Sequence, residues 1–216
     1  MKLLMLDNPE IIELAAGWLA LKENHQWLDF GNGRQIITPT LLKIMAQRPT
    51  HFMRAYTSDS DDEPVGVCCL NGVDLSFGSA TLWGAAGEKA FRSRGLGTLA
   101  ASRVLTLGFR ELGLRTINTW VVEHNPSLRL IERLKFRYVG RQRQCHIIDG
   151  QVYDRLLFDL LASEHEGIDG GELCGRNGLL QDKERGSWKQ PRMRRYDTPK
   201  AQAGGAMYAG RDLQPE

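Results

Sequence analysis

Four segments of the chain alternate between apolar and polar residues, which is the pattern of a β-strand with one buried face. Other segments place apolar residues three and four positions apart, as in a helix that covers a sheet. Gly113 follows the last of these helical segments and is a natural helix stop. The alternating segments are residues 51–56, 65–70, 79–83 and 117–122, and the helical ones are 9–19, 39–45 and 99–109.

The two ends of the stretch 1–163 add further elements. Residues 1–6 are apolar except for Lys2, and the apolar run is too short for a signal peptide, so they are predicted as the first strand. Residues 125–136 predict another helix. In the stretch 137–161, Asp149 and Gly150 lie between two strand-like arms, which is a strong hairpin signal. The predicted order is one strand, two helices, three strands, a helix, a strand, a helix and a final hairpin.

From Glu164 onward the sequence changes to glycine, proline and charged residues. This composition buries too little apolar surface to form a core, so residues 164–216 are predicted to be a flexible C-terminal tail on a domain at 1–163. The tail carries a basic cluster with Trp188 and Tyr196 interleaved, which suits an acidic protein face or a nucleic acid. We expect the tail to be dispensable for the fold and to serve a partner protein.

The segment 91–98 combines arginines and glycines directly before the third predicted helix. Glycines let the backbone approach a ligand closely, and the N–H groups and partial positive charge of a helix N-terminus bind anions. Arg92 and Arg94 add full charges in a fork that matches phosphate oxygens. The segment therefore predicts a phosphate-binding loop.

Two common phosphate loops fit this segment poorly. A Walker loop ends in Gly-Lys-Ser or Gly-Lys-Thr, which is absent here. Gly95, Gly97 and Ala100 match the dinucleotide pattern G-x-G-x-x-A, but that pattern requires a strand running straight into its first glycine. The residues before Gly95 are not strand-like, and too little chain follows to complete a doubly wound sheet.

A third loop fits better. Arg92, Gly95 and Gly97 have the spacing R/Q-x-x-G-x-G/A, and here the chain resembles the GNAT superfamily of N-acetyltransferases, whose loop cradles the pyrophosphate of acetyl-CoA. Residues 125–140 resemble a second motif of that family, N…S.RLIEKLGF…G, at the family's distance from the first. One departure is Lys135, where the family usually has glycine. The other is one residue fewer than is common after the asparagine of this motif.

The resemblance implies an α/β (α+β) fold over residues 1–163, with a mixed central sheet splayed in the middle and helices on both faces. It implies acetyl-CoA as cosubstrate and a primary amine of a small molecule or protein N-terminus as acceptor. Backbone near Gly87 would pair with the pantetheine arm and polarise the thioester carbonyl, and Asn125 would hydrogen-bond the arm at the splay. The implied cofactor-binding residues are Gly87, Arg92, Ser93, Arg94, Gly95, Leu96, Gly97, Thr98 and Asn125.

The proton donor for the departing thiolate is often a tyrosine in this family, yet Ile131 and Glu132 occupy that part of the chain. Ser127 is the preferred substitute, because ribosomal-protein N-terminal acetyltransferases and similar members carry serine in this segment. The chain therefore resembles that branch of the family. A serine at a helix start is also an ordinary cap, so a capping role stays open.

Glu123 lies at the end of the predicted central strand, where the acceptor amine would arrive, and it is the candidate general base. His124 and Glu88 are alternatives, and an amine that arrives unprotonated needs no strong base. In the family, the region between the first two helices helps to wall the acceptor site. By that resemblance the substrate-binding candidates are Trp27, Asp29 and Phe30, the alternative being an ordinary loop that packs on the sheet.

Charge and cysteine usage narrow the partners and the compartment. The formal net charge of +2 predicts neither a nucleic-acid nor a membrane surface, and no apolar stretch approaches membrane-spanning length. The four cysteines form no C-x-x-C pair, so no metal site is predicted. Cys68 and Cys69 are adjacent in a strand and are expected to be buried on opposite faces. This usage fits a reducing cytoplasm.

A second class of function stays open beside the enzyme. A GNAT-fold assembly or regulatory protein would keep the acetyl-CoA loop but act through its C-terminal arm. The intact arginine and glycine loop favours the enzyme, whereas the missing tyrosine and the long tail favour the non-catalytic protein. The oligomeric state also stays open, and a homodimer is one alternative.

Overall fold

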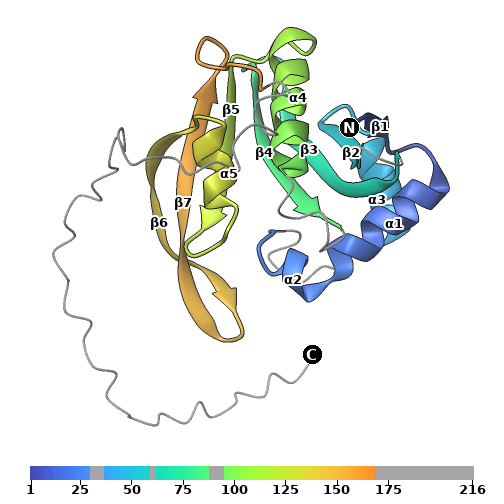
Figure 1. Cartoon of the computed structure of the whole chain (residues 1–216). Coiled ribbons are helices and arrows are strands. Elements are labelled where there is room, and N and C mark those ends of the chain that lie inside the picture. The colour runs from blue at the N-terminus through green and yellow to red at the C-terminus, as the bar shows by residue number, and fades with distance from the viewer. Residues whose placement is uncertain (30–36, 59–61, 88–94, 169–216) are drawn as a thin grey trace, which may run out of the picture. The chain divides into compact units, whose positions relative to one another are not determined.

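The computed structural model describes residues 1–29, 37–58, 62–87 and 95–168, and within these residues seven strands form one mixed sheet with helices on both faces (Figure 1). The order predicted from the sequence is confirmed, with one short helix added in the segment expected to be a loop. The elements are β1 Leu3–Met5, α1 Pro9–Ala20, α2 Lys22–His25, α3 Pro39–Ala46, β2 His51–Thr57, β3 Pro64–Asp74, β4 Ser79–Ala86, α4 Leu96–Arg110, β5 Thr116–Val122, α5 Leu128–Arg133, β6 Arg137–Ile148 and β7 Gln151–Leu161.

The strands lie in the order β1-β2-β3-β4-β5-β7-β6, and neighbours are antiparallel except for β4 and β5. These two parallel strands pair only from Ser79–Thr116 to Thr81–Asn118, although β4 continues to Ala86 and β5 to Val122. The two strands therefore separate halfway along their length, which confirms the splay expected from the family resemblance. In Figure 1 the β6–β7 hairpin lies on one side of α4 and strands β1 to β3 lie on the other.

Each face of the sheet has its own hydrophobic core. On one face α4 buries Val104 and Leu105 against residues such as Ile117. On the other face α1 and α3 cover a second cluster. Cys68 belongs to the first core and Cys69 to the second, so the expectation of opposite buried faces is confirmed. Burial raises the pKa of the Cys68 thiol to about 12, as expected for a cysteine that serves packing.

Residues after β7 pack along α4. The His165 Nε2 atom lies 2.8 Å from the Thr106 hydroxyl, and the backbone N–H of Ile168 donates to the Ser102 hydroxyl at 2.9 Å. Glu164 forms an ion pair with Arg137 of β6 at 2.7 Å. Residues 164–168 thus contact the domain, and residues 169–216 lie outside the described residues.

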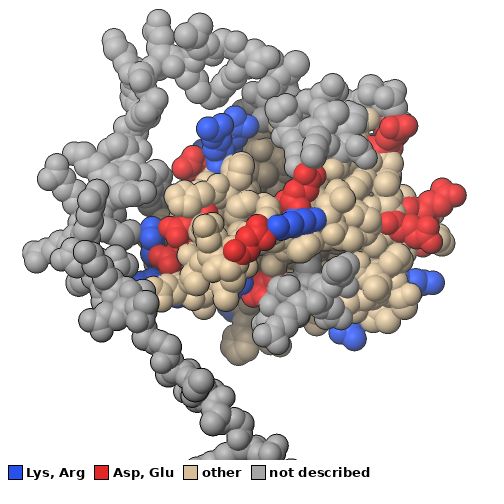
Figure 2. All heavy atoms as spheres, turned by 90° about the horizontal axis from the view of Figure 1, so that it is seen from below, with Lys and Arg blue, Asp and Glu red and all other residues tan. Residues whose placement is uncertain are grey.

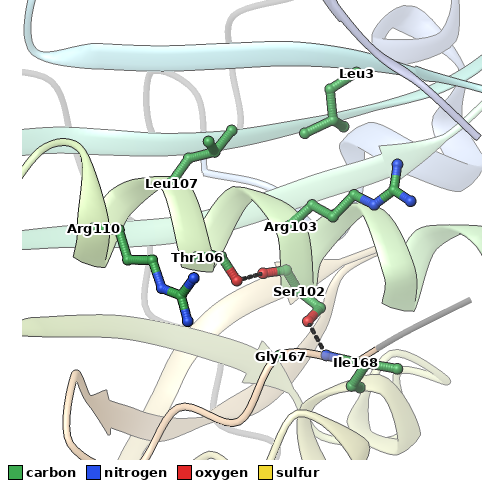
Figure 3. A pocket seen from close by; sticks show the side chains of 8 residues that line it. All are labelled: Leu3, Ser102, Arg103, Thr106, Leu107, Arg110, Gly167 and Ile168. Atoms are coloured by element: carbon green, nitrogen blue, oxygen red, sulfur yellow. Dashed lines mark hydrogen bonds between the residues drawn. The ribbon is translucent and has the colours of Figure 1, made fainter.

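A pocket of about 570 Å³ opens between α4, β1 and this C-terminal segment (Figure 3). Two exposed arginines of α4 line it, and Arg103 Nη1 donates to the backbone carbonyl of Met1 at 2.6 Å. The pocket is lined by Leu3, Ser102, Arg103, Thr106, Leu107, Arg110, Gly167 and Ile168. It contains none of the residues predicted for acetyl-CoA or acceptor binding. Among the residues described, no helix is long and apolar enough to cross a membrane.

Two strand glycines allow a matched test of how closely Tyr56 packs against the neighbouring strand. A Cβ atom at Gly66 would lie 2.2 Å from the ring of Tyr56, whereas one at Gly140 would meet nothing within 4 Å. We expect Gly66→Ala to lower the free energy of unfolding by about 1–3 kcal/mol, because the buried Tyr56 ring must move. Gly140→Ala should be neutral or slightly stabilising. Urea unfolding of both variants measures the difference, and equal stabilities would contradict this packing.

The C-terminal contacts predict where the chain can be shortened. A chain that ends at Ile168 keeps the bonds to Ser102 and Thr106, so its melting temperature should match that of the full chain. A chain that ends at Ser163 loses them and should melt at a lower temperature. Calorimetry on both truncated chains compares the two ends. A large loss of stability in the chain ending at Ile168 would show that later residues also pack on the domain.

Candidate functional site

The N-terminus of α4 begins at a glycine in the left-handed conformation. Gly95 has φ 79° and ψ −3°, backbone angles that residues other than glycine rarely adopt. Its carbonyl accepts the first helical bond from Leu99 at 3.1 Å, and it has no side chain to cap the helix. The N–H groups of Leu96, Gly97 and Thr98 therefore receive no cap from this residue and can bind an anion. The predicted loop residues Arg92, Ser93 and Arg94 lie outside the described residues.

Leu96 and Thr98 point their side chains into the protein, with exposed fractions of 4% each. They can therefore offer a ligand their backbone but not their side chains. Sequence reasoning missed Tyr56, whose hydroxyl lies 3.5 Å from the position of a Cβ at Gly97. Tyr56 pairs directly with Gly66 on β3, which leaves room for its ring. This cross-strand pairing with a glycine is the signal that could have located Tyr56.

Asn125 follows β5 closely and organises the start of α5. Its side-chain Oδ1 atom accepts a hydrogen bond from the Ser127 backbone at 2.8 Å. Ser127 itself makes no side-chain cap bond, so the capping role considered for Ser127 is wrong and Asn125 has it instead. The Ser127 hydroxyl is half-buried and has no hydrogen-bond partner among the residues that the structure describes. Within the described residues, neither the Asn125 Nδ2 donor nor the Ser127 hydroxyl is engaged in a hydrogen bond, so both can meet a ligand.

Glu123 turns its carboxylate toward β6 and β7. Its Oε1 atom accepts a hydrogen bond from the Asp154 backbone at 3.2 Å, and its Oε2 atom lies 3.5 Å from Arg141 Nη1. The same guanidinium contacts the Asp154 carboxylate at 2.9 Å. Of the two alternative bases, His124 is exposed and Glu88 lies outside the described residues. Glu123 is thus held in an ion-pair cluster rather than left unpaired at the end of β5.

The end of β4 is bonded to the first two helices. The backbone N–H of Gly87 donates to the carbonyl of Val65 at 2.8 Å, and a Cβ at Gly87 would lie 2.2 Å from the Trp18 indole. Asn24 Nδ2 donates to the carbonyls of Trp18 and Ala86, at 2.9 Å and 3.1 Å. Gly87 therefore fits closely against α1, and its N–H is occupied within the sheet in this structure.

Asp29 contacts the far half of the sheet. Its Oδ2 atom accepts a hydrogen bond from Arg155 Nη1 of β7 at 2.8 Å. The Arg155 guanidinium lies 3.9 Å from the ring centroid of Trp120 and donates to His146 Nδ1. We call Asp29, Trp120, His146 and Arg155 the Arg155 cluster. Trp27 is half-buried nearby in sequence, and Phe30 lies outside the described residues.

The Arg155 cluster lies on the sheet face opposite α4. Ile117 and Val121 of β5 face α4, so Trp120 faces the other way. Trp83 packs with the core under α1. Thr81 of β4 pairs with Asn118 of β5, and Trp83 and Trp120 each lie two residues after a member of this pair. The two tryptophans therefore lie on the same face of the separating strands, one on each side of the opening. Sequence reasoning missed both, because only the β4–β5 register brings them into correspondence.

Charges of both signs lie close together around the site. Figure 2 shows acidic and basic side chains interspersed on the face seen from below, not gathered into one patch of a single sign. The Glu123, Asp154 and Arg141 cluster and the Asp29–Arg155 pair follow the same pattern. Within the described residues, no group of three or more His, Cys, Asp or Glu side chains could hold a metal ion.

Alanine substitutions at the two residues at the start of α5 should differ in their effect on stability. Asn125→Ala removes the bond to the Ser127 backbone, so we expect it to lower the free energy of unfolding by about 0.5–2 kcal/mol. Ser127→Ala removes no cap bond and should leave stability within about 0.5 kcal/mol of the parent. Thermal unfolding monitored by circular dichroism distinguishes them. A larger loss in Ser127→Ala than in Asn125→Ala would contradict the cap assignment.

The sequence was compared with protein-family models and with known proteins. The model of the acetyltransferase (GNAT) family matches residues 19–136. An uncharacterized N-acetyltransferase p20 of Bacillus licheniformis is 30% identical over 107 residues, which are 49% of this chain and 60% of that protein. The SPbeta prophage-derived uncharacterized N-acetyltransferase YokL of Bacillus subtilis (strain 168) is 31% identical over 109 residues, 50% of this chain and 61% of that protein. The match thus spans about three fifths of each curated relative.

The fold also resembles a solved structure. Spermidine/spermine N-acetyltransferase SpeG from Vibrio cholerae, in complex with manganese ions, superposes with a TM-score of 0.53 and 20% identity over 58% of this chain and 73% of that chain. At this identity the likeness concerns the fold alone. The family model covers more than half of the chain and includes β4, α4 and β5, the elements that form the splay. The chain belongs to the GNAT family of acetyltransferases.

Proposed function

We propose that the protein is an acetyl-CoA-dependent N-acetyltransferase that acetylates a primary amine of a small molecule or a protein N-terminus. Two observations carry the proposal: α4 begins at a left-handed glycine without a side-chain cap, and β4 and β5 separate in the sheet that α4 covers. If the pyrophosphate of acetyl-CoA is bound at that helix end, the pantetheine arm could pass between the separated strands toward the opposite face of the sheet. The usage of buried cysteines supports a cytoplasmic site of action.

The residue types around the start of α4 suit the binding of acetyl-CoA. The left-handed Gly95 presents uncapped N–H groups to the pyrophosphate, and Arg92 and Arg94 would add charge. Ser93 and Gly97 complete this loop without a bulky side chain. When bound, acetyl-CoA supplies an acetyl group activated as a thioester. The free Nδ2 donor of Asn125 would then hold its pantetheine arm at the end of β5.

Two proton transfers accompany the reaction. A bond forms between the amine nitrogen and the acetyl carbon while the carbon–sulfur bond breaks, so the nitrogen loses a proton and the sulfur gains one. Ser127 would donate the proton to sulfur, because its hydroxyl is not used as a cap. This residue also supports a place near the ribosomal-protein N-terminal acetyltransferases. Glu123 would accept the amine proton through water, while Arg141 and Asp154 keep its carboxylate in place.

The acceptor would approach from the face opposite α4, where Trp83 and Trp120 flank the opening. Trp27, Asp29 and Phe30 would form its wall. The solved relative named for spermidine and spermine supports including polyamines among the acceptors to be tested. An amine panel should contain spermidine, lysine, glucosamine and a peptide with a free N-terminus.

One observation favours the non-catalytic alternative. Ile131, in the part of α5 where the family often has its tyrosine, is 4% exposed and packs in the core, so it supplies no proton donor. A GNAT-fold assembly protein would bind acetyl-CoA, transfer nothing, and use its C-terminal arm to bind a partner. The test below separates the two functions because it measures cofactor binding and turnover independently.

The test combines the amine panel with a pair of glycine variants. Gly95 and Gly113 lie at opposite ends of α4 and both have positive φ, 79° and 67°. Gly95→Trp and Gly113→Trp therefore carry similar backbone strain, but only the first lies at the proposed pyrophosphate site. We expect the wild type and Gly113→Trp to bind acetyl-CoA by calorimetry and to release thiol with at least one amine. Gly95→Trp should lose both.

Turnover of Ser127→Ala completes this test. Loss of a positioned proton donor lowers the rate on the order of 100-fold to 10,000-fold. Unchanged acetyl-CoA affinity in a folded Gly95→Trp protein would show that the site is misplaced. Binding without thiol release for any amine would favour the assembly protein.

A further inference from the structure

The Arg155 cluster joins two parts of the chain that no regular strand pairing connects. Gln26 and Asp29 belong to the segment that follows α2, whereas Trp120, His146 and Arg155 come from β5, β6 and β7. His146 Nε2 lies 2.6 Å from the Gln26 carbonyl, and Arg155 Nη1 lies 2.8 Å from Asp29. Two hydrogen bonds therefore hold this segment against the C-terminal half of the sheet, on the face opposite α4.

The geometry fixes where the ring proton of His146 lies. A carbonyl oxygen can only accept, so His146 Nε2 carries the proton that it donates to Gln26. A guanidinium can only donate, so His146 Nδ1 is the acceptor for Arg155 Nε and Nη2, at 3.3 Å and 3.0 Å. His146 thus relays a directional chain of bonds from Arg155 to Gln26. The residue is 6% exposed, so water does not replace either bond easily.

Three neighbouring side chains fix the orientation of the Arg155 guanidinium. Trp120 lies under the guanidinium plane, His146 accepts from one edge and Asp29 from another nitrogen. Its side chain is 13% exposed, and that of Asp29 is 30% exposed. The Oδ2 atom of Asp29 is used by Arg155, while Oδ1 has no hydrogen-bond partner among the described residues. Within the described part of the chain, Asp29 therefore keeps one carboxylate oxygen available to a ligand.

We propose that His146 and Arg155 are positioning residues for the acceptor amine. They hold the segment Gln26–Asp29 over the open face beside Trp120, so that Asp29 offers its free oxygen to the ammonium group of an arriving acceptor. This inference rests on the proposed acetyltransferase function. It predicts that damage to His146 or Arg155 weakens acceptor binding while leaving the α4 N-terminus, on the opposite face, able to bind acetyl-CoA.

The chain supplies a matched control for the same interface. Lys22 Nζ contacts Asp149 Oδ1 at 2.6 Å and also joins the α2 region to the β6–β7 hairpin, but both side chains are more than 60% exposed. Exposed ion pairs contribute little to stability. Lys22→Met should therefore change neither the segment nor the kinetics. Any effect specific to the Arg155 cluster must exceed the effect of this variant.

The first measurement requires no acceptor. Hydrogen exchange of the peptide covering Lys22–Asp29 should be protected in the wild type, in Lys22→Met and in His146→Gln, whose amide keeps one donor and one acceptor. His146→Leu offers neither and should lose protection there. Arg155→Lys keeps the charge but lacks the planar fork, and it should lose protection as well. Equal protection in all five proteins would overturn the proposal.

The second measurement uses the panel amine that is turned over fastest. We expect His146→Leu and Arg155→Lys to raise the acceptor KM by about 10-fold to 100-fold, with the acetyl-CoA KM within about 2-fold of the wild type. His146→Gln should restore most of the acceptor KM. A loss confined to kcat, or a rise in both KM values with a lower melting temperature, would show a general structural role and overturn the proposal. If no amine is turned over by the wild type, the acetyltransferase function fails, and the exchange experiment still decides whether the cluster holds the segment.

Discussion

The separation of β4 from β5 is the constraint on which the rest of the structure depends. Two parallel strands that part after Thr81 and Asn118 lose the hydrogen bonds they would otherwise exchange. Side chains replace two of these bonds: the Thr119 hydroxyl donates to the Leu82 carbonyl at 3.0 Å, and Asn24 donates to the carbonyl of Ala86. The opening is thus stabilised from both sides, since a buried carbonyl without a donor would cost about 1–3 kcal/mol.

Local patterns predicted the elements and their order because each depends on neighbouring residues. Alternating strands and helical spacing need no tertiary information, and neither does the Asp149-Gly150 turn, whose residues have φ 51° and 78°. Gly113 was predicted as a helix stop, and it has positive φ, as does Gly95 at the other end of α4. The family resemblance added the splay. Short helix α2 was missed, because one turn of four residues is too brief for a helical period to appear.

The proposed acceptor side could not be predicted in the same way. Asp29, Trp120, His146 and Arg155 are distant in sequence, and nothing in their local patterns indicates that they meet. Asp29 was selected from the family resemblance, but its partner Arg155 emerged only from the pairing of β7 with β5. The sequence also left the start of α5 ambiguous. Whether Asn125 or Ser127 caps that helix depends on a backbone turn that residue types alone do not specify.

An irregularity in β6 links the two polar clusters. Gln142 pairs with Arg155 and His146 pairs with Tyr153, so β6 advances four residues while β7 advances two. Asp154 lies inside this bulge, where its carboxylate accepts from the Gln144 backbone at 2.8 Å and contacts Arg141. Bulges commonly re-aim a side chain, and here the bulge places His146 beside Arg155.

Glu123 connects this bulge to the end of β5. Its backbone N–H donates to the Asp154 carbonyl at 3.1 Å, and its carboxylate receives the Asp154 N–H, so the two residues bond each other in both directions. The bulge that orients His146 therefore depends on the residue proposed as the general base. A charge change at Glu123 would disturb the bulge, because Arg141 would keep one carboxylate partner instead of two. In the proposed mechanism, proton transfer and acceptor positioning would therefore be coupled through Asp154, and an effect of Glu123 on turnover must be separated from its effect on the position of His146.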